Sequence, residues 1–443
     1  MNKENRLSPP GRPSFFILRP SSFSIHGGQV LSGTVAAGGS KNATLPMMAA
    51  SILADGPVRL EGAPRLADVD TLSLLLERLG VRAAWTPCGL TLETVDSRPI
   101  RAEYDLVNRM RASFCVLGPL LARRGRAVVA LPGGCNLGDR PVNLHLRGLA
   151  AFGAKLRIRH GYVIGRASRL RGADIDMAGP RGPTVTGTAN VLSAAVLAEG
   201  ETTIRCAAVE PEIVDLGHFL NAMGARISGL GTPTLHIRGV RQLRGVAYRM
   251  IPDRIEISTL LLAAAITHGS ATVSGAVPAH LESVLSALRQ AGATIEVDGD
   301  RIAVDAGGML RGVDICAEPY PGVPSDVQAQ WMALMSLAHG CATIADRVFP
   351  SRFLHVAELS RLGANIERGN GAAVVHGVRR LMAARVTACD LRASAALVLA
   401  GLAAEGTTIV DEIHHLDRGY ERLDEKLRQL GANVERVASG ECS

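Results

Sequence analysis

Residues 183–206 read PTVTGTANVLSAAVLAEGETTIRC, a pattern that predicts a buried helix followed by a strand. Threonines at its start are typical helix caps, and the Ala/Leu/Val run that follows has almost no polar interruption, as in a fully buried helix. Gly200 is a natural end for that helix. The segment after it, residues 201–206, is rich in β-branched residues and therefore predicts a strand.

The residues that follow complete one structural unit. An amphipathic helix is predicted from Glu212 to Met223, and Gly224 ends it. Residues 225–230 and 234–239 alternate apolar and polar side chains around a Gly/Thr/Pro turn, which predicts a hairpin. The unit is therefore a βαβαββ module whose sheet needs the buried helices as cover.

This unit of roughly 70 residues recurs six times along the 443-residue chain. Each copy has a glycine after its apolar run and a second one after its amphipathic run: Gly56, Gly125, Gly200, Gly269, Gly340 and Gly406, then Gly80, Gly153, Gly224, Gly292, Gly363 and Gly431. We expect an α/β protein with two lobes of three repeats and a cleft between them. The expected division is a disordered N-terminal extension at 1–23, one lobe at 42–250, and a second lobe at 24–41 plus 251–443.

Composition excludes several classes of function. The formal net charge is +7, but the chain lacks the basic runs and stacking aromatics of a nucleic-acid binder. Its eight cysteines are scattered without metal-ligand spacing, which fits a reducing cytoplasm and neither a structural metal site nor a disulfide framework. The apolar runs are too short to span a bilayer. We expect a cytoplasmic protein; the sequence leaves its oligomeric state open.

Comparison of the six repeats points to a site. The residues 14 or 15 positions before each first glycine are Lys41, Arg111, Thr186, Arg254, Asp326 and Arg392. Ionic groups are not expected for packing at the start of a buried helix, yet four of these six are cationic. Three more cations precede the second glycines by 11 to 13 residues: Arg140, Arg352 and Arg418. Because helix N-termini also attract anions, we expect a cleft for a small, multiply charged anion.

One loop adds a reactive group. Residues 126–145 read RAVVALPGGCNLGDRPVNLH, a predicted strand followed by a loop rich in Gly and Pro that carries Cys135. A cysteine there is not core filler, unlike Cys115 in an apolar run. The nearby Arg140 favours a lowered thiol pKa and hence a nucleophile or acid, and the glycines favour a lid.

These segments resemble the enolpyruvyl transferases. The resemblance runs from about Ile25 to Val437 and is carried by SKN at 40–42, MRAS at 110–113, LPGGC at 131–135, RPV at 140–142, EPEIVD at 210–215, PDRIE at 252–256, DVQAQ at 326–330, DLRAS at 390–394 and DRGYE at 417–421. It implies an inside-out α/β barrel arrangement in each lobe. Among members of the family, the cysteine loop is similar to that of enzymes acting on UDP-N-acetylglucosamine.

The resemblance implies a reaction and a set of roles. The enolpyruvyl group of phosphoenolpyruvate would pass to the 3-hydroxyl of UDP-N-acetylglucosamine with release of phosphate, the first committed step of peptidoglycan precursor synthesis. Cys135 would be the acid and Asp326 the base, without a metal or other cofactor. Phosphoenolpyruvate would be held by Lys41, Arg140, Arg392 and Arg418. The nucleotide sugar would be held by Arg111, Arg140, Pro141, Val142, Asn143, Leu144, Thr184, Val185 and Val348. Asn42 would join the sugar and phosphate contacts, and Arg352 would be a further substrate-binding residue.

Three positions depart from the family pattern. Asn143 stands where an aspartate is usual, Pro350 where an acidic residue is usual, and Tyr320 where a histidine is frequent. The first leaves nucleotide preference open, so one alternative is a related transferase that uses another uridine nucleotide. A second is an inactive, ligand-sensing relative, against which Cys135 and Asp326 count. RNA binding is the remote alternative.

Overall fold

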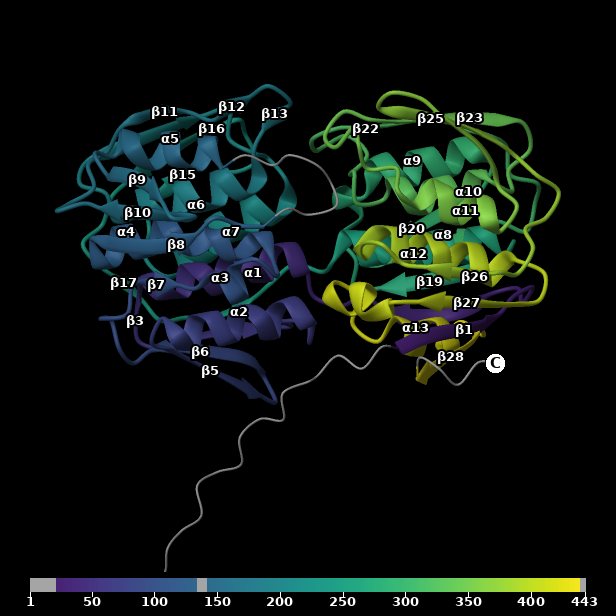
Figure 1. Cartoon of the computed structure of the whole chain (residues 1–443), viewed down its shortest axis with the longest axis horizontal. Coiled ribbons are helices and arrows are strands. Elements are labelled where there is room, and N and C mark those ends of the chain that lie inside the picture. The colour runs from purple at the N-terminus through teal and green to yellow at the C-terminus, as the bar shows by residue number, and fades with distance from the viewer. Residues whose placement is uncertain (1–20, 134–141, 439–443) are drawn as a thin grey trace, which may run out of the picture.

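The computed structural model describes residues 21–133 and 142–438. Figure 1 shows two rounded halves side by side, with the purple-to-teal part of the chain on the left and the green-to-yellow part on the right. The N-terminal strand β1 (Ser21–His26) lies in the right-hand half, beside the last strand, β28 (Asn433–Ala438). The first described residues therefore pack against the last ones.

The third repeat folds as its sequence predicts. Helix α6 (Val185–Ala195) is capped by Thr184, whose hydroxyl accepts a hydrogen bond from the amide of Gly187 at 3.2 Å. Strand β14 (Glu201–Arg205), helix α7 (Pro211–Ala222) and the antiparallel pair β15 (Ile227–Ser228) and β16 (Thr234–Arg238) follow. The helix ends at Ala195, before the predicted stop at Gly200, because a turn occupies the residues between them.

Within the described residues, six four-stranded sheets have the same order, with one parallel pair followed by two antiparallel pairs. In the left-hand half these are β18-β4-β6-β5 (Ala247–Arg249, Val58–Glu61, Gly89–Thr94, Val81–Thr86), β7-β8-β10-β9 (Arg101–Ala102, Arg126–Ala130, Tyr162–Arg166, Lys155–Arg159) and β11-β14-β16-β15, in which β11 is Asp174–Asp176. In the right-hand half they are β2-β19-β21-β20 (Ser32–Ala36, Ser270–Ser274, Arg301–Asp305, Thr294–Asp298), β22-β23-β25-β24 (Ile315–Ala317, Cys341–Asp346, Ala372–His376, Asn365–Arg368) and β26-β27-β1-β28, in which β26 is Arg385–Thr387 and β27 is Thr407–Asp411.

Three of these sheets are completed by strands from distant parts of the sequence. Strand β18 pairs in parallel with β4, so the end of the left-hand half closes its first sheet. Strands β2 and β1 likewise join the fourth and sixth sheets. Two short pairs, β3 (Ala54–Asp55) with β17 (Leu243–Arg244) and β12 (Ala178–Gly179) with β13 (Gly182–Pro183), complete the strands. The predicted α/β class with six βαβαββ repeats is confirmed.

The second glycine of every repeat serves one backbone function. All six have positive φ, from 77° at Gly80 to 107° at Gly224, a conformation that favours glycine. Among the first glycines, Gly269 differs: the preceding His268 takes the positive φ instead, at 53°. Gly269 is still required, because a Cβ there would lie 2.0 Å from the carbonyl oxygen of Leu31.

Each half combines fully buried and partly exposed helices with its three sheets. The left-hand half contains α1 (Lys41–Ala50), η1 (Ser51–Leu53), α2 (Ala67–Arg78), α3 (Tyr104–Val107), η2 (Arg111–Val116), α4 (Leu117–Arg124), α5 (Asn143–Ala151), α6 and α7. The right-hand half contains α8 (Arg254–Ile266), η3 (Pro278–His280), α9 (Glu282–Ala291), α10 (Gln328–Met335), α11 (His355–Arg361), α12 (Leu391–Ala403), η4 (Ile413–Arg418) and α13 (Leu423–Gln429). The described sheets stay separate and do not join into one closed barrel.

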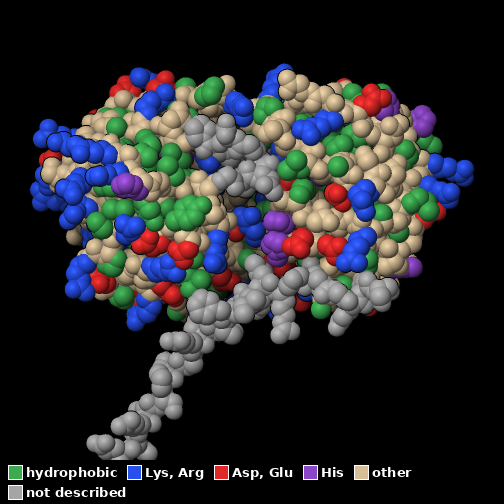
Figure 2. Space-filling model, viewed as in Figure 1, with side chains coloured by type: hydrophobic (Ala, Val, Ile, Leu, Met, Phe, Trp, Pro, Cys, Tyr) green, Lys and Arg blue, Asp and Glu red, His purple; other side chains and the backbone are tan. Residues whose placement is uncertain are grey.

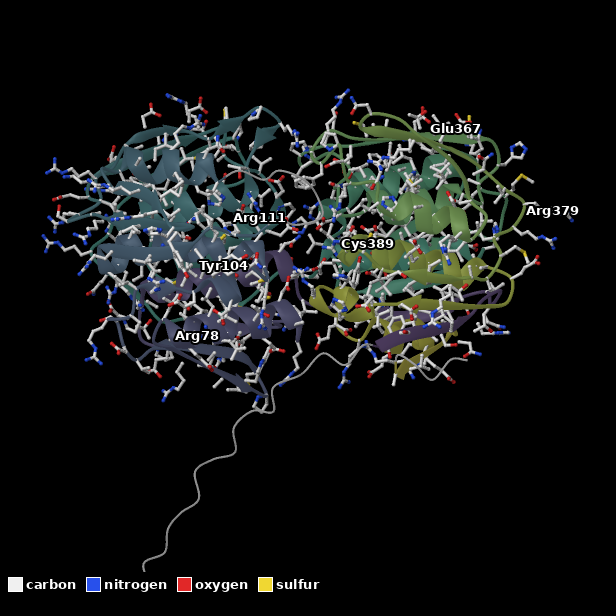
Figure 3. The ribbon with its side chains drawn as sticks, in the orientation of Figure 1. Arg78, Tyr104, Arg111, Glu367, Arg379 and Cys389 are labelled. Atoms are coloured by element: carbon white, nitrogen blue, oxygen red, sulfur yellow. The ribbon has the colours of Figure 1, made fainter. Side chains whose placement is uncertain are left out.

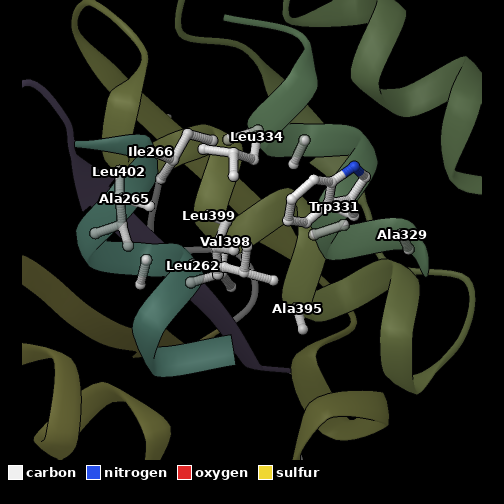
Figure 4. Packing of buried hydrophobic residues seen from close by; sticks show 14 of the residues in the cluster. Leu262, Ala265, Ile266, Ala329, Trp331, Leu334, Ala395, Val398, Leu399 and Leu402 are labelled. Carbon is white, nitrogen blue, oxygen red and sulfur yellow. The ribbon is translucent and has the colours of Figure 1, made fainter. Parts of the chain in front are cut away.

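Each half has its own hydrophobic core. One cluster draws its buried residues from positions 43–250, and the other from 23–35 and 255–434. Figure 4 shows the centre of the second cluster, where Leu262 of α8, Trp331 of α10 and Leu399 of α12 pack together. Every residue of α8 is buried, so this helix has no solvent-exposed face.

The chain crosses between the halves twice, and the two crossings pair with each other. The amide of Ser40 donates to the carbonyl of Ile251 at 2.9 Å, and the amide of Asp253 donates to the carbonyl of Gly38 at 2.8 Å. We call residues 36–41 the first junction and residues 249–254 the second junction. Because α1 and α8 begin where these junctions end, both helix N-termini lie at the boundary between the halves.

Candidate active site

Three charged side chains meet at the first junction. The ammonium of Lys41, the first residue of α1, lies 2.7 Å from Oδ2 of Asp68. The other carboxylate oxygen, Oδ1, accepts a hydrogen bond from Nε of Arg418 at 2.9 Å. Asp68 belongs to α2 and Arg418 to η4 in the opposite half. We call these residues the first junction cluster; its single carboxylate joins two cations across the boundary.

Burial and charge act on this cluster in opposite directions. Burial opposes ionisation of Asp68, but Lys41 and Arg418 outweigh it and hold the pKa of the carboxyl below its ordinary value. Burial lowers the pKa of Lys41 below 10.5, and the nearby Arg392 and Arg418 lower it further, while Asp68 raises it. Arg392 is therefore close enough to act electrostatically on Lys41. The cluster has one more cation than anion.

Asp326 is the centre of an adjoining group. Its Oδ1 accepts from Nη1 of Arg352, and its Oδ2 accepts from Nη2 of Arg392, both at 2.8 Å. Burial would raise the pKa of Asp326, but the two guanidinium groups hold it well below 3.8. The carboxylate is consequently ionised and fixed by two arginines from different repeats.

The guanidinium of Arg392 is buried, and some of its donor atoms have no acceptor among the described residues. Its side chain is 2% exposed, and the Tyr420 ring centroid lies 5.3 Å from its guanidinium carbon. Within the described residues, Nε and Nη1 have no hydrogen-bond partner. Unpartnered buried donors on a charged group are costly, so these two atoms are suited to an anionic ligand.

A network behind Arg352 orders the segment that carries Val348. Asp346 accepts hydrogen bonds from the Val348 amide at 2.9 Å and from the hydroxyl of Ser325. Nη1 of Arg352 also donates to Ser325 Oγ at 3.3 Å. Val348 is thus tied through Asp346 to the residue next to Asp326.

The left-hand half contributes a second group around His145. Nε2 of His145 lies 3.4 Å from the Thr186 hydroxyl, and Nδ1 lies 3.1 Å from the amide nitrogen of Asn190. Burial, and then Arg111, lower the pKa of His145 to about 3, so the imidazole is neutral. Arg111 and Thr186, which hold equivalent positions in repeats two and three, therefore lie near the same side chain.

His145 also brings together the segments predicted to hold the nucleotide sugar. Asn143 and Leu144 form the start of α5, directly after Val142, and Thr184 and Val185 start α6. Because His145 of α5 contacts Thr186 of α6, these two helix starts are neighbours. Asn42 follows Lys41 in α1 and is half-buried.

Cys135, Arg140 and Pro141 lie outside the described residues. Cys115, the apolar-run cysteine, is buried in η2, and burial raises its pKa to about 12. A thiol with that pKa is almost wholly protonated at neutral pH and unreactive. The prediction that Cys115 is a buried core residue is therefore confirmed. The reactive role of Cys135 stays a prediction.

The second junction has its own charged pair. Arg254, the first residue of α8, donates from Nε and Nη2 to the two oxygens of Glu212 at 2.9 and 3.2 Å. Both side chains are buried, with 9% and 3% exposed. We call this pair the second junction cluster. Arg254 was one of the phased cations, but its guanidinium pairs with both oxygens of one carboxylate.

Sequence reasoning had missed both carboxylates that pair at the junctions. Asp68 and Glu212 each lie 12 residues before their second glycines, Gly80 and Gly224. This is the phase that identified Arg352 and Arg418. This repeat phase therefore carries acids as well as cations.

The space-filling view agrees with an anion site between the halves. Figure 2 shows the surface hollowed between them, with Lys, Arg and His side chains beside the hollow. Figure 3 places Arg111 and Cys389 toward the middle of the molecule and Arg379 at its far edge.

The described ranges contain no group of His, Cys, Asp and Glu suitable for a metal ion. Every helix described is too short or too polar to cross a membrane.

Comparison with known proteins shows the family to which the chain is related. The family model for EPSP synthase (3-phosphoshikimate 1-carboxyvinyltransferase) matches residues 25–427. The chain is 49% identical over 413 residues to the UDP-N-acetylglucosamine 1-carboxyvinyltransferase of Desulfatibacillum aliphaticivorans, covering 93% of this chain and 99% of that one. It is 52% identical over 415 residues to the protein of the same name from Chlorobaculum parvum, covering 93% and 97%.

Solved structures agree. The enolpyruvyl transferase NikO from Streptomyces tendae superposes with a TM-score of 0.85 at 27% identity, covering 95% of this chain and all of that one. EPSP synthase from Acinetobacter baumannii has a TM-score of 0.72 at 18% identity, covering 94% and 100%, and shows the shared fold. The resemblance found in the sequence is confirmed: the chain belongs to the enolpyruvyl transferase family.

Proposed function

We propose that this protein transfers the enolpyruvyl group of phosphoenolpyruvate to the 3-hydroxyl of UDP-N-acetylglucosamine, releasing phosphate and making a peptidoglycan precursor. The observation that carries the proposal is the convergence of Lys41, Arg392 and Arg418 from different repeats at one boundary. Phosphoenolpyruvate has a phosphate and a carboxylate, and such a surplus of buried cations is suited to both groups. The relatives that are about half identical to this chain carry the name of this reaction.

The chemistry is an addition followed by an elimination. A proton added to the methylene carbon of phosphoenolpyruvate makes the adjacent carbon electrophilic, and the sugar hydroxyl oxygen bonds to that carbon as its own proton leaves. In the second step the methyl group loses a proton and the carbon–oxygen bond to phosphate breaks, which restores the double bond. Cations placed before the reaction begins stabilise the charge that develops on phosphate.

Asp326 is the proposed acceptor of the hydroxyl proton. Arg352 and Arg392 keep it ionised, but they also make it a weak base, because its pKa is held well below 3.8. An incoming carboxylate or phosphate that binds Nε and Nη1 of Arg392 brings negative charge close to Asp326 and offsets part of the guanidinium's charge. Binding of phosphoenolpyruvate would therefore raise the pKa of Asp326 and prepare it to take a proton.

The remaining roles follow the family pattern. Cys135 is the proposed acid toward the methylene carbon, with Arg140 as a further phosphate contact. Arg111, Asn42, Val348, the 140–144 segment and the start of α6 are proposed to hold the nucleotide sugar. Support comes from the way His145 joins α5 to α6 beside Arg111. Asn143, at the first position of α5, makes the nucleotide base the part of the acceptor to examine first.

We also propose a two-domain division and a location. The proposed boundaries are 42–250 for one domain and 24–41 plus 251–443 for the other, supported by the two separate hydrophobic clusters. A cytoplasmic location suits the substrates and the six free cysteines among the described residues.

The direct test is an assay of phosphate release. Purified protein should release phosphate from phosphoenolpyruvate only when UDP-N-acetylglucosamine is present, and mass spectrometry should show the acceptor with an added enolpyruvyl group. UMP and another uridine diphosphate sugar serve as competing acceptors. Release that does not require UDP-N-acetylglucosamine, or release with a different acceptor alone, would overturn the proposed acceptor.

A further inference from the structure

Asp326 and Asp68 each pair with two cations, but only the partners of Asp68 come from opposite halves of the described structure. The two oxygens of Asp68 contact Lys41 at 2.7 Å and Arg418 at 2.9 Å, and its side chain is 5% exposed. The cations come from opposite halves, because Lys41 starts α1 and Arg418 ends η4. Helix α2 and η4 are in contact, so the bridge spans a packed boundary.

The surroundings of Lys41 explain why this carboxylate matters. Arg392 of α12 and Arg418 of η4 both act on the ammonium, and its side chain is only 9% exposed. The other nearby acid, Asp253, accepts a hydrogen bond from the backbone amide of Lys41 and caps α8. Asp68 is the only carboxylate among the described residues that contacts the Lys41 ammonium within 4 Å. Without it, a buried amine would face two guanidinium groups.

We propose that Asp68 is a positioning residue: its carboxylate ties Lys41 to Arg418 across the two halves and keeps the Lys41 amine in its ammonium form. This inference rests on the proposed function in so far as the two cations bind phosphoenolpyruvate. An ordinary structural ion pair would only add stability. A carboxylate in the role proposed here also determines the pH at which the site remains cationic.

Loss of the Asp68 carboxylate should lower the pKa of Lys41. Asp68 raises the pKa of Lys41, while burial, Arg392 and Arg418 lower it. Replacing the carboxylate with an amide removes the negative charge and the hydrogen bond that raise the pKa of Lys41, so the variant should lose its ammonium at a lower pH than the parent protein. Activity that needs the ammonium should then decline on the alkaline side at a lower pH.

The first measurement does not depend on enzyme activity. The chain has four lysines, Lys3, Lys41, Lys155 and Lys426, so acylated peptides are readily assigned by mass spectrometry. Rates of acylation by an amine-reactive ester are measured against pH without substrates, with the exposed Lys155 as the internal reference. In Asp68→Asn the rate at Lys41 relative to Lys155 should rise about tenfold near pH 8, with its profile displaced to lower pH. Asp68→Glu should reverse most of this change.

A matched control separates this effect from general loosening. Glu256 is also buried and contacts another lysine, Lys426, at 2.7 Å. Glu256→Gln should change acylation at Lys426 and leave the Lys41 profile unaltered. If Asp68→Asn leaves the Lys41 profile in place, or if Glu256→Gln displaces it equally, the proposal is wrong.

The second measurement links the residue to catalysis. With saturating UDP-N-acetylglucosamine, the alkaline limb of kcat/KM for phosphoenolpyruvate should move to lower pH in Asp68→Asn, with most of the loss in KM. Asp68→Glu should restore the limb at least in part. An unmoved limb with an unchanged KM would contradict a positioning role. If the parent protein releases no phosphate, the proposed function fails, whereas the acylation result still decides whether Asp68 holds the charge of Lys41.

Discussion

The two junctions are built alike but carry different charge. At the first, one carboxylate, Asp68, is shared by Lys41 and Arg418. At the second, Glu212 gives both of its oxygens to Arg254. Lys41 and Arg254 hold the same position in repeats one and four, each as the first residue of a buried helix. One cluster therefore has a surplus positive charge, while the other is neutral.

This difference explains why one junction is suited to a ligand and the other to holding the halves together. A cation that shares its carboxylate with a second cation can bind an anionic substrate without losing its only partner charge. A bidentate, buried pair gains nothing from doing so, because breaking it leaves a buried charge without compensation. The repeat gives both junctions the same backbone arrangement. The side chains at a few positions then determine whether a junction can bind a ligand.

The largest expected effect comes from changing Asp326, the acid beside the first junction cluster. Asp326→Asn should lower kcat by about 10²- to 10⁴-fold, because the proposed proton acceptor is lost. Steady-state phosphate release measures this effect, and a melting curve checks that the protein is folded. Turnover close to that of the parent protein would remove Asp326 from the chemistry.

The second junction should respond in stability and not in substrate binding. Glu212→Gln leaves Arg254 buried without a counter-charge and should lower the free energy of unfolding by about 3 kcal/mol. Urea denaturation measures the change. The variant at permissive temperature should keep its KM for phosphoenolpyruvate.

A double variant serves as the control for that experiment. Glu212→Gln combined with Arg254→Met removes both charges and should recover much of the lost stability, since no buried charge is left unpaired. A large rise in KM for phosphoenolpyruvate in Glu212→Gln would show that the two junctions do not differ in the way described.

A smaller effect is expected for the more exposed cation of the first junction cluster. Arg418→Ala should raise the KM for phosphoenolpyruvate about 30-fold, equivalent to about 2 kcal/mol, because a charge-assisted contact is lost at a partly exposed group. Its side chain is 26% exposed, which moderates the loss. The matched change Arg436→Ala, at an ion pair with Asp417 in the same half, should leave this KM unchanged.

The smallest effect concerns the thiols. Alkylation by an epoxide phosphonate of the fosfomycin type should occur at Cys135 and be slowed by phosphoenolpyruvate, so Cys115→Ser should leave its rate unchanged. Burial of Cys115 and its pKa of about 12 exclude it as the reactive thiol. Cys135→Asp should abolish alkylation while keeping part of the activity, since a carboxyl group can also donate a proton. Peptide mapping that finds the adduct on Cys115 would contradict this assignment.

The sequence predicted the repeat well because its signals are local. The Thr184 cap, the glycines with positive φ and the apolar helix runs all act within one repeat. The way the chain closes was not predicted, because β18 pairs with β4 over a long sequence separation and periodicity carries no information about partners.

The sequence singled out the cations of the candidate site and Asp326, but it did not single out Asp68. Lys41, Arg392 and Arg418 stood out because charge is unexpected at buried helix starts. Asp68 looked like an ordinary acid in the first turn of α2, where acids are favoured anyway. Only the packing of α2 against η4 shows that it serves a cation from the opposite half.

The central claim is that the cations at the first junction form one binding site for phosphoenolpyruvate between the halves. A crystal structure of the complex with phosphoenolpyruvate and UDP-N-acetylglucosamine tests it most directly. We predict that the phosphate or carboxylate of phosphoenolpyruvate lies within hydrogen-bond distance of Lys41, Arg392 and Arg418, with Arg254 still paired to Glu212. Phosphoenolpyruvate bound elsewhere, or bound at Arg254 in place of Glu212, would contradict the claim.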